Sequence, residues 1–184
     1  MKTKQVMATA GLTILALAAA GATLAASKAE IDERVGATLS QFESLNPANK
    51  TLQDKAAGML VFPSVTKGGA GVAAEHGEGV LRVDGKTVDY YSVNAGSVGL
   101  TLGLAQHSEI IMFMTKEALG KFLATKGWSI GADAGITMVS AGANGMYDSK
   151  IENKPILAFQ FNDKGLLGDL SVEGEKITKM KTPM

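Results

Sequence analysis

The sequence contains no cysteine, so neither a disulfide nor a lipid attached through cysteine is available to it. The chain can be stable without disulfides, because even the 158 or so residues left after loss of an N-terminal leader bury a sizeable core. The lack of cysteine therefore does not exclude an oxidising compartment. It does exclude a lipoprotein that is anchored through a cysteine.

Histidine is scarce and the net charge is low. The 18 basic residues balance 18 acidic residues, and loss of Lys2 and Lys4 with a leader leaves a net charge of about −2. This balance argues against a nucleic-acid partner, which favours basic domains. His76 and His107 are the only histidines, and no HExxH motif or acidic calcium loop occurs. The sequence therefore predicts no metal site and no cofactor.

The N-terminus has the pattern of a secretory signal peptide. Two lysines, Lys2 and Lys4, precede an apolar run over residues 6–26, and small residues at its end offer a cleavage site after Ala25 or Ala26. The alternative is an uncleaved membrane anchor, since the run is about long enough to span a bilayer. Alanine and glycine dominate the run and insert weakly, which favours cleavage. We expect a signal peptide over 1–26 and a periplasmic or secreted product.

Residues 27–58 are predicted to form the helical part of a single domain. Ser27 and Glu30 have the spacing of a capping box, and apolar residues then recur at helical spacing up to Asn46-Pro47. A second, shorter helix is predicted over residues 51–57. The first helix could lie on a membrane or pack on its own sheet. Its net charge of −2 favours packing, because interfacial helices favour a basic face.

Residues 59–184 are predicted to form a β-rich core. Asp84-Gly85 is a hairpin turn between β-rich arms, and a second turn is expected at His107-Ser108. A short helix is predicted near 116–124, with Thr115 as its cap. The expected fold class is α+β: N-terminal amphipathic helices, then a glycine-rich, mostly antiparallel sheet that curls towards a barrel.

Two short motifs resemble catalytic or nucleotide-binding loops. Residues 69–74 match Gly-x-Gly-x-x-Ala, but a dinucleotide loop needs a helix next, and the following residues predict a strand. Ser97 lies in "NAGSVG", which resembles a nucleophile elbow but also precedes a predicted strand. The sequence therefore predicts that the chain binds no nucleotide and is not an enzyme.

Several quoted stretches carry a family resemblance. "VFPSVTKGG", "GEGVL", "YYS" with "GSVG", and "MTKEAL" resemble bacterial members of the SYLF domain family, also known as the Las17-binding actin-regulator family. The resemblance extends over residues 55–180. It implies a lipid-binding domain without catalytic residues. Eukaryotic relatives bind phosphoinositides, and some bind actin through a basic N-terminus, which a signal peptide replaces here.

The glycine-rich stretch beside Lys67 is the candidate binding site. We expect Gly68, Gly69 and Gly71 to form a turn at a strand corner, where backbone amides and Lys67 would contact an anionic headgroup. Lys50 and Lys55 are further candidates. The alternative for Lys67 is an ordinary solvated turn residue.

These features predict an exported, non-enzymatic protein that binds anionic phospholipid or a membrane surface. The alternative is a periplasmic structural or stress-related protein that contacts other envelope proteins.

Overall fold

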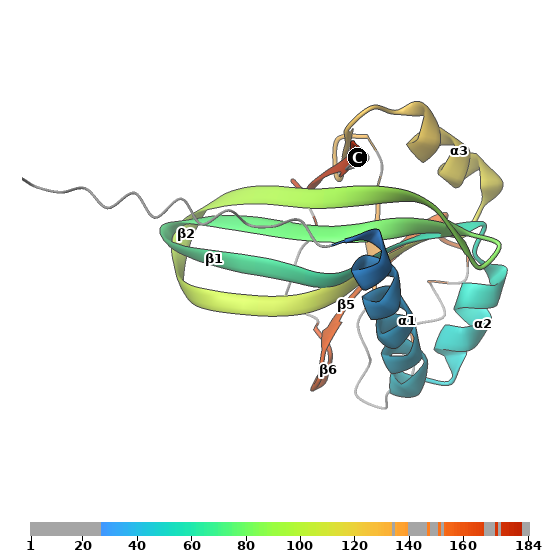
Figure 1. The fold of residues 1–184 in the computed structure, drawn as a ribbon. Coiled ribbons are helices and arrows are strands. Elements are labelled where there is room, and N and C mark those ends of the chain that lie inside the picture. The colour runs from blue at the N-terminus through green and yellow to red at the C-terminus, as the bar shows by residue number, and fades with distance from the viewer. Residues whose placement is uncertain are drawn as a thin grey trace, which may run out of the picture.

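The computed structural model describes residues 27–133, 135–139, 147, 151, 153–167, 172 and 174–181. The predicted signal peptide, residues 1–26, lies outside this range, as do the side chains of residues 70, 71 and 97–103. The fold is α+β, with N-terminal helices followed by a mostly antiparallel, curled sheet, as the sequence predicts (Figure 1).

Three helices form where caps and apolar spacing favour them. α1 covers Lys28–Leu45, and the Ser27 hydroxyl accepts a hydrogen bond from Glu30 N. α2 covers Ala48–Lys55, so it begins three residues earlier than predicted, where the Asn46 side chain accepts a hydrogen bond from Ala48 N. α3 covers Lys116–Ala124 and is capped by Thr115, as predicted.

Two long strands dominate the sheet. β1 (Gly58–Val83) and β2 (Lys86–Phe113) pair along their whole length and are joined by the predicted turn at Asp84-Gly85. Both turn residues have positive φ, 49° and 73°, as expected for the favoured two-residue hairpin turns. Five short strands complete the described sheet: β3 (Trp128–Ser129), β4 (Thr137–Met138), β5 (Ile156–Asn162), β6 (Gly165–Leu166) and β7 (Lys176–Lys179). β5 and β7 flank β2, and only the β4–β5 pair is parallel.

This region forms fewer, longer strands than its sequence predicts. Gly68, Gly69 and Gly71 lie within β1, which continues through this strand corner with a register shift between Ala70 and Val72. Such a shift marks a β-bulge, which bends a strand without ending it. The turn expected at His107-Ser108 is absent from β2. β2 continues through both residues, and the Ser108 hydroxyl donates a hydrogen bond to Pro63 O across the ladder.

Both long strands double back at the same end of the molecule (Figure 1). Their outer halves therefore return alongside their inner halves. A Cβ atom added at Gly77 would lie 2.9 Å from Ser64 O, and one at Gly79 would overlap Val61 O. Glycine is required at these two positions because two segments of one strand approach closely there. We call residues 66–76 of β1 and 94–106 of β2 the bent end.

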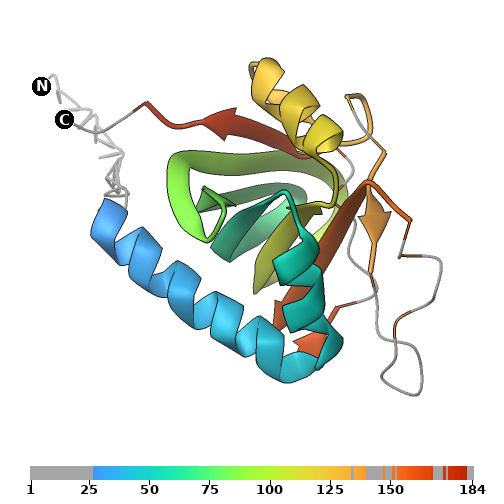
Figure 2. The same ribbon diagram turned by 90° about the vertical axis from the view of Figure 1, so that its right-hand side faces the viewer.

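The sheet buries both of its faces. Leu60 and Phe62 of β1 pack in one apolar cluster with α3 and Trp128, whereas Met59 and Val61 pack in a second cluster with α1. Figure 2 shows the sheet curling between these two helices. Uninterrupted apolar runs such as "MLVF" are typical of strands that are buried on both faces.

α1 packs on the sheet, in agreement with the preferred prediction. Its apolar side chains are buried, and Asp32 accepts hydrogen bonds from Thr87 Oγ1 (2.8 Å) and Tyr90 Oη (2.6 Å) of β2. Within the described part of the chain, no helix combines the length and the apolar composition needed to cross a membrane.

We predict that Gly79→Ala destabilises the protein by about 1–3 kcal/mol, the usual cost of overpacking. The new methyl group would overlap the backbone oxygen of Val61, which cannot rotate away. Urea unfolding measures the effect, and Gly96→Ala is the control because a Cβ at Gly96 meets no atom within 4 Å. Equal free energies of unfolding for the two variants would show that the close approach does not constrain the fold.

Candidate functional site

The three lysines proposed from the sequence do not lie together. Lys50 and Lys55 are exposed on α2, and Lys50 forms an ion pair with Asp54. Lys67 lies nine residues into β1, roughly 25–30 Å along the strand from its start at Gly58. Lys67 is only partly exposed, and its Nζ lies 3.6 Å from Glu75 Oε2. A single headgroup cannot contact Lys67 and α2 at once.

Lys67 instead borders a cluster of buried polar side chains beneath the bent end. His107 Nε2 lies 3.6 Å from Glu75 Oε1 and 3.9 Å from Glu109 Oε2. Gln160 Nε2 donates a 2.8 Å hydrogen bond to Glu109 Oε2. We call the whole group the inner polar cluster; its members are Lys67, Glu75, His107, Glu109, Gln160 and Glu175.

Glu175 is the member of this cluster with the most perturbed charge. Burial, the nearby charges of Glu109 and Glu75, and a hydrogen bond with Glu109 together raise the pKa of its carboxyl group to about 10, although Lys67 lowers it. A carboxyl group in this environment stays protonated at neutral pH. The inner polar cluster therefore carries fewer negative charges than its three glutamates suggest.

The inner polar cluster does not have the arrangement of a metal site. Over the described ranges, no group of three or more histidine, cysteine, aspartate or glutamate side chains is placed to hold a metal ion. Among the members of the inner polar cluster, only Lys67 has more than about a tenth of its side-chain surface exposed. The cluster instead joins β1, β2, β5 and the segment that leads into β7, because each contributes one or two of its members.

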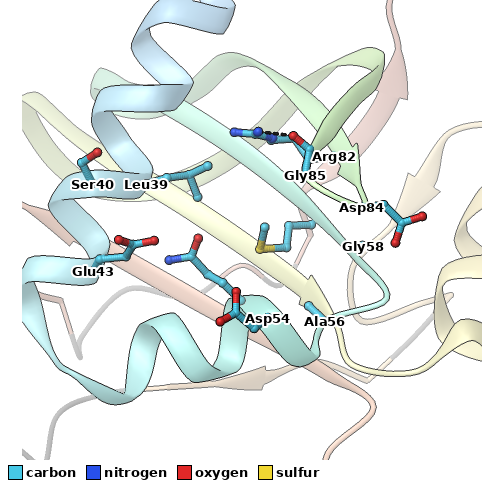
Figure 3. Close-up of a pocket in the computed structure, with 11 residues that line it drawn as sticks. Leu39, Ser40, Glu43, Asp54, Ala56, Gly58, Arg82, Asp84 and Gly85 are labelled. Carbon is cyan, nitrogen blue, oxygen red and sulfur yellow. Dashed lines mark hydrogen bonds between the residues drawn. The ribbon is translucent and has the colours of Figure 1, made fainter.

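A pocket of about 410 Å³ lies at the other end of the hairpin (Figure 3). Its walls come from α1, α2, the start of β1 and the Asp84-Gly85 turn. Three carboxylates and one guanidinium line it, together with small polar and apolar groups: Glu43, Asp54, Asp84, Arg82, Leu39, Ser40, Gln53, Ala56, Gly58, Met59 and Gly85. Arg82 donates a hydrogen bond to Gly85 O. An excess of carboxylates makes this pocket unsuitable for an anionic headgroup.

Four exposed lysines lie on and beside β7. We call Lys126, Lys176, Lys179 and Lys181 the lysine strip. A Cβ atom at Gly127 would lie 3.2 Å from Lys176 Cε, so the backbone next to Lys126 runs beside the Lys176 side chain. Lys176 pairs across the ladder with Asn94, the first residue of the bent end on β2. Lys179 donates a 2.6 Å hydrogen bond to Asp89.

The lysine strip was missed in the sequence analysis, although a signal was present. "KITKMK" places one buried isoleucine, Ile177, among exposed lysines. Glu175 is the only acidic residue in 174–181, and it is buried. What the sequence could not show is that Gly127 and Lys126 lie beside this strand, since the contact joins residues about 50 positions apart.

Comparison with known families supports the resemblance found in the sequence. Residues 94–182, just under half of the chain, match the family described as Las17-binding protein actin regulator. The match includes the second half of the bent end and the lysine strip. Residues 55–93, which also carry the resemblance, lie outside the match. Comparison with curated proteins gives no match.

We predict that Glu175→Gln makes the protein more stable at neutral and alkaline pH, with little gain near pH 4. Because the folded-state pKa is raised, the folded chain keeps a proton that the unfolded chain loses above about pH 4.5. The stability of the parent therefore falls between about pH 4.5 and 10, by up to about 1.4 kcal/mol per pH unit. The neutral amide removes this loss.

Unfolding free energies measured from pH 4 to pH 9 test this prediction. Glu117→Gln is the control, because Glu117 is exposed on α3 and a hydrogen bond from Lys121 lowers its pKa. A Glu175→Gln curve that runs parallel to that of the parent would contradict a protonated Glu175.

Proposed function

Because residues 94–182 carry the domain of the Las17-binding protein actin regulator family, we propose that this chain is a non-enzymatic protein that binds anionic phospholipid at a membrane surface. The observation that carries the proposal is the lysine strip. Its four ammonium groups are exposed, and three of them follow one another along six residues of chain.

The electrostatic attraction expected between these lysines and anionic lipid is sufficient for binding at a membrane surface. Each lysine close to an anionic leaflet contributes about 1 kcal/mol, and the contribution falls off within a Debye length. The hydrogen bond to Asp89 reduces the contribution of Lys179. Three to four such contacts attract the protein to anionic lipid while the attraction stays reversible and sensitive to salt.

The predicted signal peptide and the lack of cysteine support an exported, unlipidated protein whose partner is the lipid of the cell envelope. Under this proposal the glutamates of the inner polar cluster have a structural role. The alternative, an envelope protein that acts through protein contacts, predicts no dependence on lipid charge.

We predict that the double variant Lys176→Glu/Lys181→Glu loses most of its binding to anionic vesicles. Each reversal removes one attraction and adds one repulsion, so each costs about 2 kcal/mol, or more than tenfold in affinity. Both residues are exposed, so the fold should be nearly as stable as the parent. Flotation with vesicles of phosphatidylglycerol and phosphatidylcholine at two salt concentrations measures the binding.

Lys50→Glu/Lys55→Glu is the matched control, since it changes the net charge equally but on α2. We expect it to float nearly as well as the parent. If the α2 variant lost more vesicle binding than the β7 variant, the headgroup site would be at Lys50 and Lys55, which were first proposed from the sequence. Binding that is indifferent to lipid charge would favour the alternative function.

The proposed export has its own test. The intact mass of the protein recovered from outside the cytoplasm should correspond to loss of residues 1–25 or 1–26. Recovery of the full-length chain in washed membranes would instead indicate an uncleaved anchor.

A further inference from the structure

The bent end exposes large apolar side chains. Leu104 is 85% exposed and Val72 is 66% exposed. The other exposed large apolar residues in the described chain, Val88 (51%) and Leu123 (53%), lie elsewhere, near the hairpin turn and on α3. Large apolar side chains that are exposed together are uncommon on soluble proteins and mark interaction sites.

Leu104 and Val72 lie at the same end of the hairpin although 32 residues separate them in the sequence. Leu104 pairs across the ladder with Gly68. The chain curls tightly at the next residue, because a Cβ atom at Gly69 would overlap Val72 O. Both side chains therefore belong to the same tip of the molecule.

The bent end also lacks exposed negative charge. Residues 66–76 and 94–106 include a single acid, Glu75, and that side chain is buried with its carboxylate 3.6 Å from Lys67 Nζ. The other titratable side chains in these residues are Lys67 and His76. A surface with exposed leucine and valine and no exposed carboxylate is not repelled by an anionic bilayer.

We infer that the bent end is the part of the molecule that enters the bilayer, with Leu104 and Val72 in its apolar region and the lysine strip at the headgroups. This inference rests on the proposed function and adds to it the orientation and the inserted residues. Its geometric basis is continuity, because Lys176 of the strip lies opposite Asn94, where the bent end begins on β2.

The sheet limits how deeply the bent end enters. β7 covers residues 91–94 of β2 and β5 covers 108–113, so in the described sheet residues 95–107 have β1 on one side and no strand on the other. Backbone groups along that open edge need water or headgroups as partners, since unpaired groups are costly in hydrocarbon. The insertion is therefore shallow, at the depth of interfacial elements.

A fluorophore at the tip tests the insertion directly. The chain has no cysteine, so Leu104→Cys and Val88→Cys each allow labelling at one position with an environment-sensitive dye. On addition of phosphatidylglycerol vesicles, we expect the dye at position 104 to brighten and shift to the blue and the dye at position 88 to stay unchanged. Flotation of the same samples reports whether the protein is bound.

Serine variants measure the apolar contribution. Leu104→Ser should weaken vesicle binding about tenfold, whereas Leu123→Ser, on α3, should bind like the parent. The ratio between parent and Leu104→Ser should persist at high salt, because transfer of an apolar side chain is not screened. Both side chains are exposed, so both variants should fold.

The outcomes separate this inference from the proposed function. Flotation without a change of the dye at position 104 overturns the insertion and leaves surface binding intact. Failure of the parent to float overturns both. A dye signal at position 104 that rises with protein concentration in the absence of lipid overturns the insertion too, because a second copy of the chain then covers the tip.

Discussion

The close contact between the two halves of β1 is the constraint on which the rest of the structure depends. Gly77 and Gly79 allow this contact, since any side chain there would meet the backbone near Ser64 and Val61. Once the strand is doubled, β2 must double with it, because the two strands pair on both sides of the bend. The bend then forms a tip that β5 and β7 do not reach.

The same doubling explains why polar groups lie inside the protein near this tip. It brings Glu75 from one half of β1 next to Lys67 from the other half, and next to His107 of β2. Glu175 adds a protonated carboxyl group at the start of β7. Because side chains alternate along a strand, burial of Glu175 and Ile177 directs Lys176 outward. The interior of the molecule thus fixes the outward direction of Lys176, whereas Lys179 follows Ile177 on the other side of β7 and pairs with Asp89.

Local signals in the sequence were sufficient to predict the caps and turns that depend on contacts between nearby residues. The caps at Ser27 and Thr115 and the turn at Asp84-Gly85 were predicted because each is made by residues within a few positions. The glycines at 68, 69 and 71 indicated a strand corner, but the sharpness of the bend depends on contacts between residues 61–65 and 77–79, which lie far apart in the sequence. Lys67 was expected to contact a headgroup, with a solvated turn residue as the alternative, and its ion pair with Glu75 was not foreseen because Glu75 comes close only when the strand doubles back.

Under the proposed function, charge separation would let a chain with almost no net charge recognise an anionic surface. The pocket beside the hairpin turn carries Glu43, Asp54 and Asp84, whereas one end of the lysine strip, Lys176, lies beside the bent end. A molecule with this distribution is turned by an anionic surface so that the strip faces it and the pocket points away. Under the proposed orientation the same rotation would bring Leu104 towards the bilayer. Electrostatic attraction would then set the orientation and decline with salt, while apolar contact would add affinity that salt does not remove.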